Sequence, residues 1–155
     1  MKYRLLILLM ICTTVAGLSS CDESLSYSHY EHAPLTGWEK NDTLIFCTRP
    51  VAKTGRYHIE VGLRTTNDYP FTSVSLNIEQ YVSSQAVKVN YKPQLILMEK
   101  NGKIKGQGVS LYQYTMPVAD IKLQQGDSVR FCVRHDMKRE ILPGIADVGI
   151  TLTRR

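Results

Sequence analysis

Apolar and polar residues alternate with a period of two through most of the chain after residue 43. The clearest case is 57–64, where Tyr, Ile, Val and Leu occupy the odd positions and His, Glu, Gly and Arg the even ones. Successive side chains of a β-strand point to opposite faces, so this pattern predicts a strand with one buried face. The same reasoning predicts further strands at 44–48, 74–78, 87–91, 94–98, 111–118, 129–133 and 148–153.

Turn-forming residues separate these segments. Asn67–Pro70 lies between two predicted strands, Glu99–Gly102 ends in Asn-Gly, and Gln125–Asp127 contains a central glycine. Asn-Gly accepts the positive φ angles that a tight hairpin turn requires. No stretch keeps an apolar face at helical spacing long enough to predict a helix. About eight strands at this spacing predict an all-β fold, an antiparallel β-sandwich resembling a jelly roll.

The first twenty residues have a different character. Lys2 and Arg4 precede an apolar run over 5–15, which is shorter than the roughly 20 residues of a spanning helix and predicts a signal peptide. Leu18-Ser19-Ser20-Cys21 then resembles a bacterial lipobox. We expect cleavage before Cys21, attachment of diacylglycerol to its thiol, and a third acyl chain, such as palmitate, on the freed amine. Two or three acyl chains hold a protein stably at a bilayer.

These features predict a signal peptide over 1–20, a lipidated tether over 21–37 and a β-sandwich domain over 38–155. Asp22 and Glu23 follow the anchor and are either a surface-export signal or part of a solvated tether, so the domain faces the periplasm or the cell surface. Removing Lys2 and Arg4 takes two charges from the formal net charge of +5 and leaves +3. A charge this small does not indicate a nucleic-acid partner.

Composition fits one soluble domain of ordinary kind. A length of 155 residues is enough for one domain with its own core. Hydrophobic residues make up 43% and charged residues 21%, which excludes a disordered chain.

Cys47 and Cys132 are the cysteines that remain if Cys12 leaves with the signal peptide and Cys21 is lipidated. Each follows a phenylalanine, so both thiols lie on the outer face of their sheets if the phenylalanines point inward. In an oxidising compartment they form a disulfide if their strands are neighbours and their Cα atoms lie within about 7 Å. Otherwise they are two separate thiols.

The sequence shows no recognisable catalytic or metal-binding set. His29 and His32 are close in sequence but lack further ligands, so we expect exposed histidines and no metal site. A Gly-x-Ser-x-Gly motif is missing, and Arg134-His135-Asp136 matches only a fragment of a kinase catalytic loop. We therefore expect no enzymatic activity and no cofactor.

Two groups of residues are candidates for an interaction surface. Tyr27, Tyr30 and Trp38 either cover the edge of the core or form an exposed binding site. Arg134 is the first residue of a basic cluster that continues with Lys138 and Arg139. The cluster is either a solvated strand end or a docking patch for an acidic partner or a lipid head group.

Several stretches together resemble the gliding-motility lipoprotein GldH family of the Bacteroidota. They are Trp38–Phe46, Tyr57–Arg64 with Tyr69-Pro70-Phe71, Gly106–Tyr112, and Arg134–Arg139 leading into Leu142–Gly149. The resemblance implies a non-enzymatic envelope lipoprotein associated with gliding and, in some relatives, with type IX secretion. We therefore expect a membrane-anchored module that binds other envelope proteins. A cell-surface carbohydrate-binding β-sandwich, which the nine tyrosines also fit, is the alternative.

Overall fold

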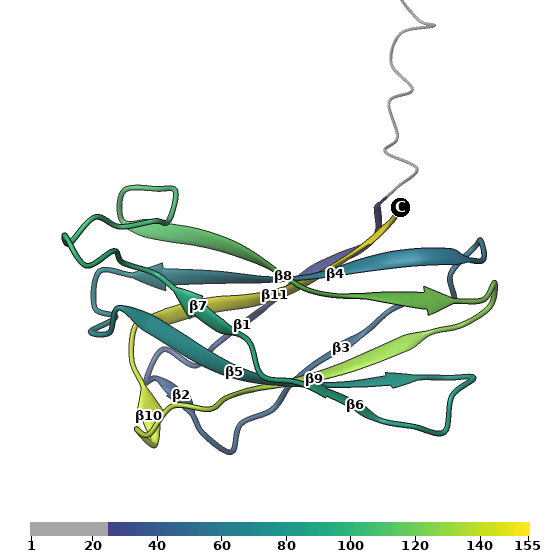
Figure 1. The fold of residues 1–155 in the computed structure, drawn as a ribbon. Coiled ribbons are helices and arrows are strands. Elements are labelled where there is room, and N and C mark those ends of the chain that lie inside the picture. The colour runs from purple at the N-terminus through teal and green to yellow at the C-terminus, as the bar shows by residue number, and fades with distance from the viewer. Residues whose placement is uncertain (1–24) are drawn as a thin grey trace, which may run out of the picture.

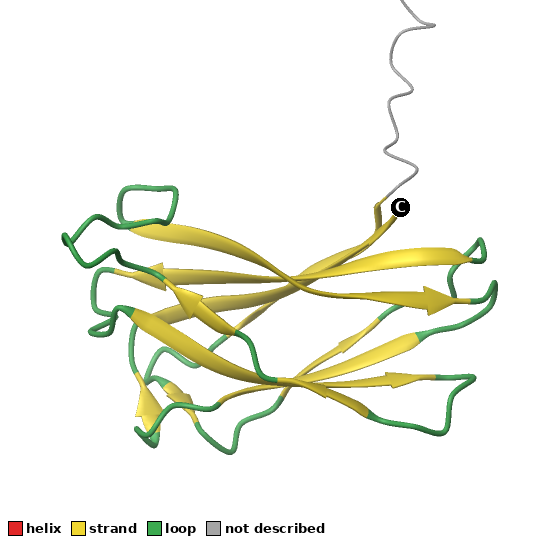
Figure 2. Ribbon diagram, viewed as in Figure 1, coloured by secondary structure: helices red, strands yellow, loops and turns green. Residues whose placement is uncertain are grey.

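A computed structural model describes residues 25–155, which form two stacked β-sheets (Figures 1 and 2). This arrangement confirms the predicted all-β antiparallel sandwich. The predicted signal peptide and Cys21 lie outside the described residues. Within the described residues, no helix is long and apolar enough to cross a membrane.

The upper sheet in Figure 1 has the strand order β1-β11-β4-β8. Every neighbouring pair in it is antiparallel. The strands are β1 (Leu25–His32), β11 (Ile145–Arg154), β4 (Gly55–Thr66) and β8 (Leu111–Leu123). The long strand β8 therefore forms one edge of this sheet, and β1 forms the other.

The lower sheet has the order β3-β9-β5-β6, and β7 pairs with a separate part of β5. A two-stranded ribbon, β2-β10, lies at one end of the sandwich. The strands are β2 (Trp38–Glu39), β3 (Leu44–Cys47), β5 (Ser73–Val82), β6 (Val89–Tyr91), β7 (Gln94–Ile96), β9 (Val129–His135) and β10 (Ile141–Leu142).

The core lies between the sheets and is built from the alternating apolar positions. In β4 the side chains of Ile59, Val61 and Leu63 are fully buried. Phe46 of β3 and Phe131 of β9 face each other in the register and are also buried. The strand predicted over 87–91 is shorter in the structure: Val87 is 70% exposed in the loop before β6. Val87 continues the apolar alternation of β6, but the pairing of β6 with β5 begins only at Val89.

The described part of the predicted tether is an integral edge strand. Residues 25–32 pair with β11, with a register shift between Leu25 and Tyr27. The Tyr30 ring lies flat over Gly149 and Gly62, where a Cβ atom on Gly149 would come within 2.6 Å of Cε1 of Tyr30. The Arg64 guanidinium stacks on the same ring, 4.1 Å from its centroid. The β-sandwich therefore includes residue 25 and does not begin only at Trp38.

One end of the core is closed by Trp38 and His135. Trp38 is fully buried, and its Nε1–H donates to the carbonyl oxygen of Asp42 at 3.1 Å. The His135 ring meets the indole edge to face, with centroids 5.3 Å apart. His135 Nε2 lies 3.1 Å from the Trp38 carbonyl oxygen, and the Met137 N–H donates to His135 Nδ1. Both contacts suit a neutral imidazole protonated on Nε2.

This geometry predicts a loss of stability in mild acid. Burial lowers the pKa of His135, although its hydrogen bond to the Trp38 carbonyl acts in the opposite direction. The unfolded chain therefore takes up this proton first, and the free energy of unfolding falls as the pH drops below about 6.5. The slope approaches about 1.4 kcal/mol per pH unit until the folded-state pKa is reached. Urea unfolding across this range measures it. We expect His135→Gln to lack this part of the slope, and equal slopes in both proteins would contradict the assignment.

Candidate functional site

The six residues predicted as an interaction surface do not form one surface. Trp38 is buried in the core, and Tyr27 packs against the core from β1. Neither side chain is therefore exposed as a binding site. Tyr30 lies on the outer face of the upper sheet under Arg64. Successive side chains of β1 point to opposite faces of the sheet. Tyr27 therefore covers the core, while Tyr30 covers the outer face.

The basic members of that set are also divided. Arg134 belongs to β9, where its Nη2 donates to Oε1 of Glu79 on the neighbouring strand β5 at 3.1 Å. Lys138 and Arg139 are exposed in the loop that follows β9, together with Glu140. The charge of Arg134 is thus largely balanced within the lower sheet. The loop carries both signs of charge and fits a solvated turn.

The two cysteines lie on the outer side of neighbouring strands. Cys47 is opposite Arg130 in the register, and Cys132 is opposite Ile45, so the thiols are diagonal neighbours. Diagonal positions lie about 7–8 Å apart, beyond the reach of a disulfide without backbone movement. Both thiols are free in the structure, and partial burial raises the pKa of Cys132. Of the two alternatives that the sequence left open, the structure shows two separate thiols.

The histidines occupy several different environments. His29 lies 2.9 Å from Glu31, and His58 contacts Asp120 at 2.6 Å. We expected exposed histidines, which is wrong for two of the four: His58 is half-buried, and His135 is only 2% exposed behind Trp38. Across residues 25–155, no three His, Cys, Asp or Glu side chains come together as a metal site would need.

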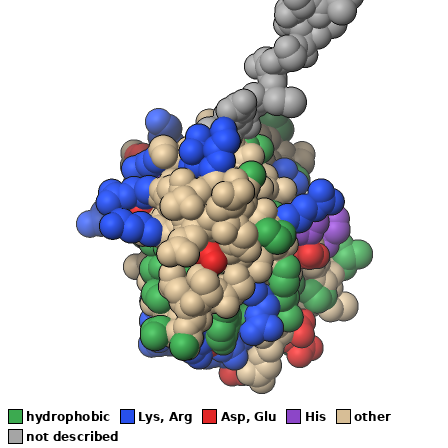
Figure 3. Space-filling model, turned by 90° about the vertical axis from the view of Figure 1, so that its right-hand side faces the viewer, with side chains coloured by type: hydrophobic (Ala, Val, Ile, Leu, Met, Phe, Trp, Pro, Cys, Tyr) green, Lys and Arg blue, Asp and Glu red, His purple; other side chains and the backbone are tan. Residues whose placement is uncertain are grey.

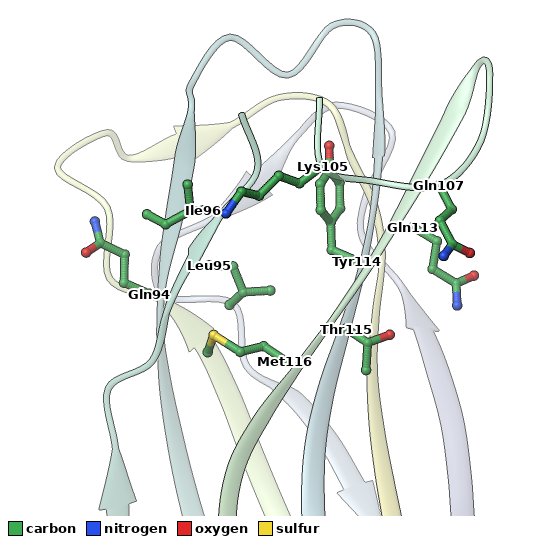
Figure 4. A pocket seen from close by; sticks show the side chains of 9 residues that line it. All are labelled: Gln94, Leu95, Ile96, Lys105, Gln107, Gln113, Tyr114, Thr115 and Met116. Carbon is green, nitrogen blue, oxygen red and sulfur yellow. The ribbon is translucent and has the colours of Figure 1, made fainter. Parts of the chain in front are cut away.

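A groove lies between the edge strands β7 and β8, on the open side of the sandwich (Figure 4). Its volume is about 510 Å³. Leu95 and Ile96 contribute apolar surface from β7, and Met116 does so from β8. Polar side chains complete the lining: Gln94, Lys105, Gln107, Gln113, Tyr114 and Thr115.

The segment between β7 and β8 forms the rim of the groove. The backbone N–H of Gln107 donates to the Gln113 carbonyl at 3.0 Å, and the Gln113 N–H donates back at 2.9 Å. Tyr114 packs over Gly106, where a Cβ atom would lie 2.6 Å from Cζ of the tyrosine. The Lys105 side chain extends across the groove toward Ile96 (Figure 4). Amides, a cation and a phenol thus border an apolar floor.

The edge of β8 offers a main-chain donor and acceptor to this groove. Gln113 and Thr115 pair with Arg64 and Gly62 of β4 without a register shift between them. Backbone polar groups alternate in direction along an antiparallel strand. Because the N–H and C=O of Gln113 point away from β4, those of Thr115 also point outward. Two residues further on, Pro117 has no N–H, and a bulge follows it. Only a short part of the edge is therefore open for strand pairing.

Sequence reasoning did not find this groove. Periodicity identified β8 as a half-buried strand, and nothing in the order of residues indicated that β7 lies opposite it. The amide side chains Gln107 and Gln113 give no motif, because glutamines are common on exposed strands and loops. The one local signal is Pro117 within a predicted strand, since proline in a strand favours an edge.

Comparisons with known proteins identify the family of this chain. The curated gliding motility lipoprotein GldH of Flavobacterium johnsoniae is 25% identical over 151 residues, covering 89% of this chain and 90% of that protein. Among solved structures, a Sulfurospirillum deleyianum protein, GEBA250068378, has a TM-score of 0.45 at 11% identity, covering 83% of this chain and 98% of that chain. A family 35 carbohydrate-binding module from Clostridium thermocellum has a TM-score of 0.41 at 14% identity, covering 83% and 90%. At these scores the structural likeness carries no functional argument.

A family model matches the sequence of this chain. The family model described as GldH lipoprotein matches residues 25–152, which is most of the chain and the whole of the sandwich apart from its last residues. The chain therefore belongs to the GldH lipoprotein family.

Proposed function

We propose that this protein is a non-enzymatic module, anchored in the cell envelope through lipid on Cys21, that binds an extended segment of another envelope protein in the groove between β7 and β8. The family supports the lipoprotein part of this proposal. The main observation for the binding part is that the backbone N–H and C=O of Thr115 point away from β4, in a groove that Gln107 and Gln113 also line. An extended peptide pairs its own backbone with such an edge and places alternate side chains in the groove.

The composition of the groove fits a peptide better than a sugar. Carbohydrate-binding sandwiches would need exposed aromatic rings for stacking, and every Tyr, Phe and Trp within residues 25–155 is at least partly buried. Tyr114, the aromatic residue of the groove, packs over Gly106. The apolar floor of Leu95 and Met116 suits a small apolar side chain of a bound strand. Association of this partner with gliding is part of the same proposal, and the name of the curated relative supports it. A link to type IX secretion is proposed with it.

The substitution Thr115→Pro tests the backbone contact. The N–H of Thr115 points away from β4, so proline removes a donor in the groove without removing a ladder hydrogen bond. One such hydrogen bond contributes about 0.5–1.5 kcal/mol, so we expect several-fold weaker partner binding. The measurement is photo-crosslinking from a reactive residue at position 113 in intact membranes, with the crosslinked polypeptide identified by mass spectrometry.

A matched variant and a control position accompany this test. Thr115→Val keeps the N–H and should keep the crosslink, and a reactive residue at position 100, outside the groove, should give none. Equal crosslinking in Thr115→Pro and Thr115→Val would exclude strand pairing at this edge. Glycan-array binding by the protein, without any crosslinked polypeptide, would favour the carbohydrate-binding alternative.

A further inference from the structure

Positive charge gathers at the end of the sandwich farthest from the groove. The loops 48–54, 83–88 and 124–128 form this end, at the right of Figure 1. Figure 3 looks onto it and shows Lys and Arg side chains around its rim. We call this surface the basic end, defined by four residues: Lys53, Arg56, Lys122 and Arg154. At the opposite end the charges are mixed, with Glu99 beside Lys100 and Glu140 beside Arg139.

The acidic residues near the basic end are already engaged. Asp120 contacts His58 at 2.6 Å and Arg155 at 3.3 Å. Asp127 is buried, and its carboxylate accepts the Gln124 N–H at 2.8 Å. Further cations follow nearby at Arg49, Lys88 and Arg130, so positive charge exceeds negative charge even when Asp22 and Glu23 are included.

Two of the cations are cross-strand neighbours at a cavity. Arg56 of β4 is directly opposite Lys122 of β8, and like charges in that position repel. Both line a cavity of about 620 Å³ together with Ser84, Gln85 and Gln124. Asp127 also lines this cavity, and its carboxylate is held by the Gln124 N–H. An anionic group between Arg56 and Lys122 would relieve the repulsion, and the hydroxyl and amide groups would bond its oxygens.

The position of the expected anchor brings this end to the bilayer. Ser26 of β1 shares a surface depression with Lys53 and Arg154. Only residues 22–24 separate Cys21 from Leu25, and an extended residue spans about 3.3–3.6 Å, so these two Cα atoms lie at most about 14 Å apart. The Debye length is about 8 Å at physiological salt. The basic end thus lies within one or two screening lengths of the lipid head groups. The far end lies a strand length away, which for the 12 residues of β4 is about 40 Å.

We infer that the basic end is a membrane-docking surface that binds anionic lipid head groups, with the phosphate between Arg56 and Lys122. This inference rests on the proposed lipid anchor at Cys21 but not on the groove. Docking in this orientation holds the sandwich upright on the bilayer and presents the groove between β7 and β8 away from it. Val87, exposed beside Lys88 in the loop 83–88, adds an apolar contact at the same surface.

Lysine acetylation of the reconstituted lipoprotein tests the orientation. The protein, purified with its own lipid, is placed in vesicles of phosphatidylcholine alone or of phosphatidylcholine with phosphatidylglycerol. On the anionic vesicles, acetylation of Lys53 and Lys122 should slow several-fold, while Lys100 and Lys103 at the far end keep their rates. Each basic side chain near an anionic surface favours binding about fivefold. The double variant Arg56→Gln with Lys122→Gln should therefore weaken docking about 25-fold and restore the acetylation of Lys53.

The controls separate the anchor from the docking surface. Lys100→Gln with Lys103→Gln removes the same charge at the far end and should leave Lys53 protected. Raised ionic strength should remove the protection, because it screens the charges. Equal acetylation of Lys53 in both vesicle types, in protein that floats with them, would overturn the docking surface and leave the anchor intact. Failure to float with either vesicle type would refute the anchor and, with it, this inference.

Discussion

Replacing Trp38 with alanine should lower the free energy of unfolding by about 3–5 kcal/mol. The indole is fully buried, packs edge to face with His135, and donates a hydrogen bond to the Asp42 carbonyl. Alanine would leave a cavity at the end of the core and an unpaired carbonyl. Domains of this size are stable by about 5–15 kcal/mol, so the change removes a large part of the total. Urea unfolding followed by far-ultraviolet circular dichroism measures it.

Leu35 provides the control, because it lies just before Trp38, in the connection between β1 and β2, but is fully exposed. Leu35→Ala should change stability by no more than about 0.5 kcal/mol. Trp38→Phe keeps an aromatic ring, loses the N–H donor and should fall between the two. An unchanged urea midpoint for Trp38→Ala would contradict the burial of the indole. It would instead favour the surface role that the sequence left open for this residue.

Strands with a fully alternating face could be predicted from the sequence, because their pattern reflects a local rule. The segment 57–64 became the centre of β4, and the turn at Glu99–Gly102 occurs with a positive φ at Gly102. Asn101 keeps a negative φ, so the turn is not of the type that Asn-Gly most favours. Strand β1 was missed since its inward positions include the polar residues His29 and Glu31. An edge strand covers only the rim of the core and needs no apolar alternation.

Both surfaces to which we assign roles depend on pairing between distant parts of the chain. The groove needs β7 and β8 to face each other across the sandwich. The basic end collects Lys53 from the loop before β4, Lys122 from the end of β8 and Arg154 from the end of β11. These residues are far apart in sequence. A count of charges gives only a modest net value, so neither composition nor spacing indicated this asymmetry. The order of residues predicted the strands of the two sheets. The two surfaces depend on which strands lie next to each other in the folded chain.

Replacing Cys21 with alanine should abolish lipid attachment and have the largest effect on where the protein is found. Without the thiol no diacylglycerol can be transferred, and the chain stays as an uncleaved precursor or is released from the membrane. Each buried CH₂ of an acyl chain contributes about 0.8 kcal/mol, so losing two or three chains removes nearly all membrane affinity. The measurement is the intact mass of the protein, together with membrane flotation at raised ionic strength, which suppresses attraction between the basic end and lipid.

Two other cysteines serve as controls for this substitution. Cys12→Ala lies within the apolar run of the predicted signal peptide, and Cys47→Ala removes an exposed thiol of β3. Both variants should be processed, carry lipid and float as the unsubstituted protein does. Normal processing and flotation of Cys21→Ala would instead show that another feature holds the protein at the membrane. The close approach of the basic end would then lose its geometric basis, because the short reach from residue 21 to β1 is what brings Lys53 and Arg154 to the head groups.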